Sequence, residues 1–133
     1  GHLIGLQALN VDRNQLGMIP PEIGDLTNLK HLNFAGNQLA SVPAEIGNLT
    51  NLESLWLTSN RLTSIPVEVG NCRKLKSLNL PHNQLSDLPL GMGDLPDIKL
   101  LDVRNNLLVT LPTDLETLKD LCVLKFDDNP LAS

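Results

Sequence analysis

Residues 29–51 read LKHLNFAGNQLASVPAEIGNLTN, and residues 52–74, LESLWLTSNRLTSIPVEVGNCRK, follow the same pattern without a gap. This period of 23 residues runs through the whole chain. Each period starts with a leucine or isoleucine, at Leu6, Leu29, Leu52, Leu75, Ile98 and Leu121. One asparagine per period falls at Asn14, Asn37, Asn60, Asn83, Asn106 and Asn129. A fixed period of this length predicts stacked coils, in which each coil packs only on its neighbours.

Written once, the unit is LxxLxLxxNxLxxLPxxIGxLxx. In this consensus the chain resembles the leucine-rich-repeat family over its whole length. The 23-residue form is similar to the intracellular type found in Ras-pathway scaffolds and in erbin- and scribble-like polarity scaffolds. The resemblance implies an α/β fold, a right-handed solenoid with short parallel strands on its concave face and short helical or 3-10 turns on its convex face.

A length of 133 residues fits one leucine-rich-repeat domain over residues 1–133. We expect a partial repeat over residues 1–5, repeats that start at residues 6, 29, 52, 75 and 98, and a partial repeat over residues 121–133. Neither end carries a polar cap, so we expect a domain taken from a longer protein. Exposed, leucine-lined coil ends also favour end-to-end self-association.

The residue types support this architecture independently of the resemblance. In LESLWL, residues 52–57, strand alternation directs Leu55 and Leu57 inward and leaves Ser54, Trp56 and Thr58 on the outer face of the sheet. Proline followed three residues later by Ile-Gly, as in residues 43–47, predicts a short helical turn on the convex side with the proline at its first position.

The repeated asparagine falls at an inward position, where a polar side chain is costly unless it is hydrogen-bonded. A column of asparagines can meet this need, because each amide carries donors and acceptors for backbone groups. Repeat 75–97 departs most from the pattern. Pro81 follows a strand residue and cannot donate to the ladder, and Gly91 and Gly93 flank Met92, so we expect a looser repeat there.

The charge pattern separates the two faces. The net charge is −5, which argues against a partner that is a nucleic acid or an anionic membrane surface. By register, the convex wall carries nine acids and three bases, whereas the concave side carries five acids and six bases. A nearly neutral, mixed concave face is suited to a specific protein partner.

Trp56 is the one tryptophan of the chain, and it is predicted to project from the concave sheet. Tryptophan is enriched where the energy of protein binding is concentrated, so Trp56 is our candidate anchor. The alternative is that it only covers the sheet between its neighbours. The polar residues expected around it, and to bind the partner with it, are His31, Asn33, Ser54, Thr58, Ser77 and Asn79.

A second candidate patch lies on the later strands. Leu100 and Val123 are predicted to face outward, beside three charged residues that we also assign to partner binding, Asp102, Arg104 and Lys125. Two interpretations stay open: the charges form ion pairs between neighbouring strands, or the patch is where a partner or a missing cap packs on the apolar pair.

Catalytic and metal chemistry receive little support. Asp102, Asp127, Asp128 and His82 lack the spacing of a metal site, and no nucleophile elbow, phosphate loop or Cys-x-x-Cys motif is present. His31 near Ser54 or Ser77 lacks an orienting acid. We therefore expect no enzyme activity, no metal and no cofactor.

Cys72 and Cys122 fall on different coils, so we expect free thiols and a cytoplasmic location. The leading interpretation is thus a scaffold or signalling module that binds a protein on its concave face. Two alternatives stay open. One is an extracellular recognition domain, for which Asn48-Leu-Thr supplies a possible glycan acceptor. The other is a regulatory arm of a larger enzyme.

Overall fold

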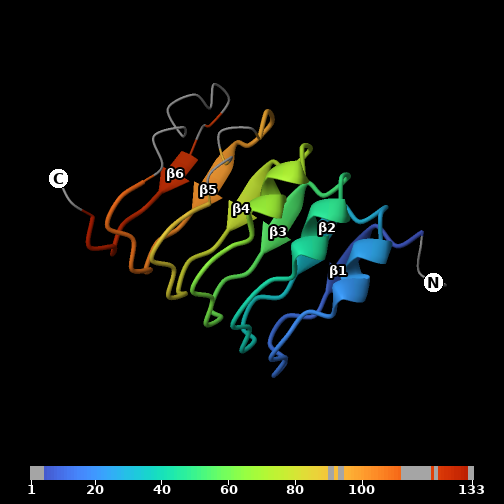
Figure 1. Cartoon of the computed structure of the whole chain (residues 1–133), viewed down its shortest axis with the longest axis horizontal. Helices are drawn as coiled ribbons and strands as arrows, with labels where there is room; N and C mark the ends of the chain where they lie inside the picture. The colour runs from blue at the N-terminus through green and yellow to red at the C-terminus, as the bar shows by residue number, and fades with distance from the viewer. Residues whose placement is uncertain (1–4, 90–91, 93–94, 112–120, 122, 132–133) are drawn as a thin grey trace.

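The computed structural model describes residues 5–89, 92, 95–111, 121 and 123–131. Its sheet contains six parallel strands that follow one another in chain order. They are β1 (Ala8–Asn10), β2 (His31–Asn33), β3 (Ser54–Trp56), β4 (Ser77–Asn79), β5 (Leu100–Asp102) and β6 (Val123–Lys125). Figure 1 shows the strands side by side from the N-terminal end to the C-terminal end, which confirms the predicted solenoid.

The strand register follows the sequence period. Each strand residue pairs with the residue 23 positions later, as in Leu32 with Leu55 and Leu55 with Leu78. These central leucines are almost fully buried, because alternation turns them into the coil. Trp56, on the other side of the pleat, is only half-buried. The predicted inward and outward positions of β3 are therefore confirmed.

Three short 3-10 helices form the described part of the convex wall (Figure 1). They are η1 (Pro21–Asp25), η2 (Ala44–Asn48) and η3 (Val67–Asn71). Their Ile23, Ile46 and Val69 side chains are buried against the strand leucines. The repeated proline lies one residue earlier than predicted. Pro43, for example, precedes η2 in an extended conformation, with φ of −70° and ψ of 151°.

The asparagine column links each coil to the one before it. Asn60 Nδ2 donates to the carbonyl of Leu57 in its own coil and to that of Phe34 in the preceding coil, both at 3.0 Å. Its Oδ1 accepts the backbone N–H of Leu39 at 3.0 Å. The same set of bonds is made by Asn37, Asn83, Asn106 and Asn129. The predicted structural role of these side chains is confirmed.

Each coil turns away from its strand through a residue with positive φ. The φ values lie between 55° and 70° at Arg13, Gly36, Ser59, His82, Asn105 and Asp128. In this conformation the backbone N–H still reaches the next coil, as in the bond from Ser59 to the carbonyl of Pro81 at 2.9 Å. The turn is therefore imposed by coil stacking even where the side chain disfavours it.

Pro81 does not loosen the sheet, contrary to our expectation. The N–H groups on either side of it, those of Leu80 and His82, bond to the following coil at 2.7 and 3.0 Å. At the equivalent position of the second coil, Ala35 N–H bonds to the Asn33 side chain and not to the ladder. A proline here thus removes no ladder bond. Gly91 and Gly93 lie outside the described residues.

Candidate functional site

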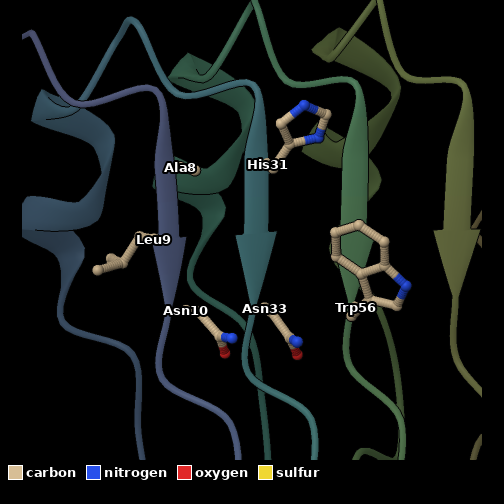
Figure 2. A pocket seen from close by; sticks show the side chains of 6 residues that line it. All are labelled: Ala8, Leu9, Asn10, His31, Asn33 and Trp56. Atoms are coloured by element: carbon tan, nitrogen blue, oxygen red, sulfur yellow. The ribbon is translucent and has the colours of Figure 1, made fainter.

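A hollow of about 270 Å³ lies on the concave face over β1, β2 and β3. Figure 2 shows the side chains that line it, Ala8, Leu9, Asn10, His31, Asn33 and Trp56. Ala8 pairs with His31 in the strand register, so a methyl group lies where the next strand carries an imidazole. This difference in size leaves open space beside His31.

Two aromatic side chains border the hollow. The imidazole of His31, on β2, and the indole of Trp56, on β3, have ring centroids 6.5 Å apart and planes tilted by 39°. They are diagonal neighbours, because His31 pairs with Ser54 while Trp56 pairs with Asn33. Aromatic side chains on adjacent strands reach each other across such diagonals. The predicted proximity of His31 and Asn33 to Trp56 is therefore found.

The asparagines at the ends of β1 and β2 have a fixed orientation. Asn10 Oδ1 accepts the backbone N–H of Asp12 at 3.1 Å, and Asn33 Oδ1 accepts that of Ala35 at 2.9 Å. Since a backbone N–H can only donate, each amide oxygen must face the backbone and each NH₂ group must face away from it. Figure 2 shows the two amide groups side by side below the aromatic pair.

An ion pair lies at the opposite edge of the site. Lys76 Nζ is 3.3 Å from Glu53 Oε1, and the two residues precede β4 and β3. The hydrogen bond and the positive charge of Lys76 lower the pKa of Glu53. Lys30, which precedes β2, lowers it further through its charge. Both side chains of the pair are exposed enough for solvent to screen their attraction, so the pair sets local charge more than stability.

Asn79 differs from its predicted role at the rim of the site. Only 8% of it is exposed, and its Nδ2 donates to Ser77 Oγ at 2.9 Å and to the Leu55 carbonyl at 3.4 Å. In the register it lies between Trp56 and Asp102, and neighbours on both sides limit its exposure. Asn79 is thus part of the support beneath the surface, and Ser77 is its acceptor.

Asp102 is also buried, with 5% exposed, although we predicted it at the binding surface. Arg104 Nε and Nη2 donate to its two carboxylate oxygens at 2.9 and 2.8 Å. Burial acts to raise the pKa of Asp102, but the hydrogen bonds and charge of Arg104 outweigh it, so the pKa is lowered. The ion pair lies within one strand segment and not between neighbouring strands.

The remaining predicted residues fall into two places. Ser54 and Thr58 are half-buried, at the start of β3 and just beyond its end. Lys125 is exposed on β6, three strands from Trp56, so the second patch is separate from the hollow. There Val123 is 40% exposed and pairs with the half-buried Leu100, as the outward prediction requires.

Sequence reasoning missed Ala8, Leu9 and Asn10 as lining residues. Asn10 falls in the same column of the repeat as Asn33 and Trp56, which was a usable signal. For Ala8 the signal was the small side chain in a column that continues with His31 and two serines. Leu9 occupies a core position, but on the first described strand it is only partly buried.

Several other site types find no support in the described residues. No three His, Cys, Asp or Glu side chains gather there in a way that could hold a metal ion. Within the same residues, no hydrogen bond joins His31 to Ser54 or Ser77. No helix among them is long and apolar enough to span a bilayer. Cys72 is buried and unpaired, while Cys122 lies outside the described residues.

Family models match most of the chain. One described as "Leucine Rich Repeat" matches residues 5–26, "Leucine Rich repeats (2 copies)" matches residues 27–68, and "Leucine rich repeat" matches residues 50–108. No curated protein matches the chain.

Solved structures of repeat proteins are similar over almost the whole chain. A leucine-rich-repeat protein of Leptospira interrogans is 38% identical with a TM-score of 0.96, covering 98% of this chain and 33% of that one. The ectodomain of the Arabidopsis thaliana receptor kinase SOBIR1 is 32% identical with a TM-score of 0.81, covering 92% and 70%. The plant peptide hormone receptor RGFR1, in complex with RGF2, is 34% identical with a TM-score of 0.87, covering 96% and 21%. The chain thus spans a third of the Leptospira protein and about a fifth of RGFR1.

Proposed function

Because the chain belongs to the leucine-rich-repeat family, we propose that it is a protein-binding module whose partner docks on the concave face at the hollow beside Trp56. The observation that carries the proposal is the half-buried Trp56 ring, placed beside His31 at the border of the 270 Å³ hollow. A large aromatic side chain that still has surface to bury is the kind of residue that dominates protein–protein binding energy.

The arrangement around Trp56 supports its role as an anchor. Asn33 and Asn10 supply polar groups next to the ring, and Ala8 supplies apolar surface. Apolar contact at the centre with hydrogen-bonding groups around it is the usual composition of a protein interface. We include Ser54, Thr58 and Ser77 as neighbouring contacts, and Arg104 and Lys125 as contacts for a partner long enough to reach β6. Asn79 and Asp102 act by supporting them.

The proposal also covers the cellular role, the location and the self-association of the module. We propose a scaffold or signalling role in the cytoplasm, without enzyme activity of the module itself, and the buried free thiol of Cys72 supports a reducing compartment. End-to-end self-association is a further possibility that sedimentation at high protein concentration would test. A strictly monomeric profile would exclude it.

An extracellular recognition domain is the second candidate, and the similarity to the SOBIR1 ectodomain and to the hormone receptor RGFR1 favours it. Asn48 is exposed at the end of η2, where a glycan could be attached. Mass spectrometry of the full-length protein from its native source separates the two candidates, because an occupied Asn48 requires passage through the secretory pathway. A regulatory arm of a larger enzyme also remains a candidate, since the chain spans only part of its relatives.

The test of the proposed site is affinity capture from a lysate of the source organism. The immobilised proteins are the wild type, Trp56→Ala and Val67→Ala, all first shown to unfold at similar denaturant concentrations. Val67 is the matched control, because it is 60% exposed and lies on η3 of the convex wall. The proposal expects partners that bind the wild type and Val67→Ala but are lost with Trp56→Ala. Identical partner lists for all three proteins would overturn it.

A further inference from the structure

The hollow offers hydrogen-bond donors in a fixed place. Asn10 and Asn33 each turn their Oδ1 atom toward the backbone N–H that it accepts, so their NH₂ groups are the polar groups turned away from the backbone. Among the described residues, neither Nδ2 has a protein acceptor. His31 adds one ring N–H and one ring acceptor when neutral. The polar atoms that face a bound group are therefore mostly donors, which favours an acceptor over a cation.

The spacing of the Asn10 and Asn33 NH₂ groups indicates which kind of acceptor they can bind. Asn10 and Asn33 are register partners on adjacent parallel strands, which run about 4.8 Å apart. A carboxylate can bridge them, because each of its two oxygens can accept from one amide. Hydrogen bonds to an ionised acceptor are about twice as strong as those to a neutral one.

The surrounding charges are compatible with an anion. Lys30 precedes β2 and is exposed, whereas the nearby Glu53 carboxylate is already held by Lys76 at 3.3 Å. Asp12 and Arg13 follow β1 and offset each other in charge. The charge near the hollow is therefore slightly positive, in contrast to the acidic net charge of the whole chain.

The apolar part of the hollow is suited to an apolar side chain of the ligand, next to the group that the amides bind. Figure 2 shows the Trp56 nitrogen on the side of β4, so the hydrocarbon part of the indole faces the hollow. Together with Ala8 it forms an apolar surface next to the amide donors. A single extended segment can serve both, because neighbouring side chains of a peptide lie close enough to reach the two groups.

From these observations we propose that the hollow binds a partner-protein segment in which an Asp or Glu side chain, held by the NH₂ groups of Asn10 and Asn33, adjoins an apolar side chain packed on Trp56. This inference rests on the proposed function, since it names the chemistry of the partner at the same site.

A natural aspartate at the equivalent position of another strand suggests Asn33→Asp as the test variant. Asp102 occupies on β5 the position that Asn33 occupies on β2, and its Oδ1 accepts the N–H of Arg104 at 3.2 Å, as Asn33 does with Ala35. Asn33→Asp thus keeps the local backbone bond while replacing the NH₂ donor by a negative oxygen. The variant is expected to fold and to lose only the recognition of an anion.

The experiment titrates ¹⁵N-labelled protein with three acetylated and amidated peptides, Leu-Glu-Leu, Leu-Gln-Leu and Leu-Lys-Leu, and follows nuclear magnetic resonance shifts. The expected result is that Leu-Glu-Leu moves the side-chain amide signals of Asn10 and Asn33 together with the Trp56 indole signal. Its affinity should exceed that of Leu-Gln-Leu about three- to tenfold, with Leu-Lys-Leu weakest. With Asn33→Asp the order of Leu-Glu-Leu and Leu-Lys-Leu should reverse.

Equal shifts with the Gln or Lys peptide, an unchanged order in Asn33→Asp, or no shift of the Asn10 and Asn33 signals by any peptide would each overturn the inference. The Trp56→Ala variant distinguishes failure of the carboxylate inference from failure of the proposed function. This variant should bind all three peptides more weakly, by a similar factor, and keep their order of affinity. If Trp56→Ala loses partners in the capture experiment but the wild type shows no preference for the Glu peptide, the protein-binding site stands. The proposal that it binds a carboxylate is then rejected.

Discussion

Asn60 accepts, through its Oδ1 atom, a hydrogen bond of 3.0 Å from the backbone N–H of Leu39, which belongs to the preceding coil. The same side chain donates to carbonyls of both coils. The Leu39 N–H has this amide as its acceptor, whereas each carbonyl also accepts from a second asparagine, Phe34 from Asn37 at 2.8 Å and Leu57 from Asn83 at 2.9 Å. Stability of the array depends on these contacts between coils as well as on leucine packing.

Replacing Asn60 by alanine should lower the free energy of unfolding by about 2 kcal/mol, because the buried Leu39 N–H loses its acceptor and an unsatisfied buried group costs about 1–3 kcal/mol. Urea denaturation followed by Trp56 fluorescence measures the change. Asn14→Ala is the matched control, since Asn14 is exposed and bonds only to Val11 and Asp12 of its own coil. Similar losses in both variants would contradict the role of the contact between coils.

Gly47 is required by the close approach of η2 and η3. A Cβ atom at this residue would lie 2.7 Å from the carbonyl oxygen of Glu68. Gly47→Ala should therefore destabilise the fold by about 2 kcal/mol, as expected for an overpacked contact. At Gly17 an added Cβ meets nothing within 4 Å, so Gly17→Ala should unfold like the wild type. A Gly47→Ala protein of unchanged stability would show that the two turns can separate freely.

The Asp102–Arg104 pair should make stability depend on pH. The pKa of Asp102 is lowered in the folded chain, so the pair stabilises the fold above the ordinary Asp value of 3.8 and this stabilisation is lost as the pH falls through the folded value. Asp102→Asn keeps the side-chain oxygen that accepts the Arg104 N–H but removes the charge. We expect it to cost about 1 kcal/mol at pH 7, with solvent screening of the 42% exposed Arg104 side chain taken into account.

Unfolding free energies of Asp102→Asn and the wild type at neutral and strongly acid pH provide the check. The difference should disappear in acid. A constant difference across the pH range would mean that packing, and not charge, is the contribution of Asp102.

Cys72 should be unreactive in the folded protein. Burial raises the pKa of its thiol to about 11, and its Sγ lies 3.3 Å from the Ile46 carbonyl that it donates to. In a Cys122→Ser background, a thiol reagent at pH 8 should label the folded chain far more slowly than the urea-unfolded chain, because the thiolate is the reactive form. Equally rapid labelling of both would place Cys72 at the surface.

The 23-residue period was sufficient to predict the strands, their parallel register and the asparagine column, because stacking allows few other arrangements of so regular a pattern. Trp56 could be assigned to the concave face for the same reason. The exact start of each 3-10 helix could not be predicted, since proline fits equally well just before a helix and at its first position.

Features that depend on departures from the repeat were harder to predict. The burial of Asn79 and Asp102 depends on the side chains of adjacent strands and on the reach of Arg104, which no repeat position specifies. Pro81 was expected to disturb the ladder because the absent N–H was assumed to be a ladder donor. The hollow itself depends on the small size of Ala8, a local difference and not a property of the consensus.

The most direct test of the protein-binding site is the dissociation constant of a captured partner for the wild type and for Trp56→Ala at equal folded fraction. Trp56 is the single tryptophan of a chain without tyrosine, so its fluorescence also reports binding to the wild-type hollow. We predict that the partner changes this fluorescence and that Trp56→Ala binds at least about tenfold more weakly, as for an anchor worth more than about 1.4 kcal/mol. Equal dissociation constants, with no fluorescence change on binding, would contradict the assignment of the concave hollow as the binding site.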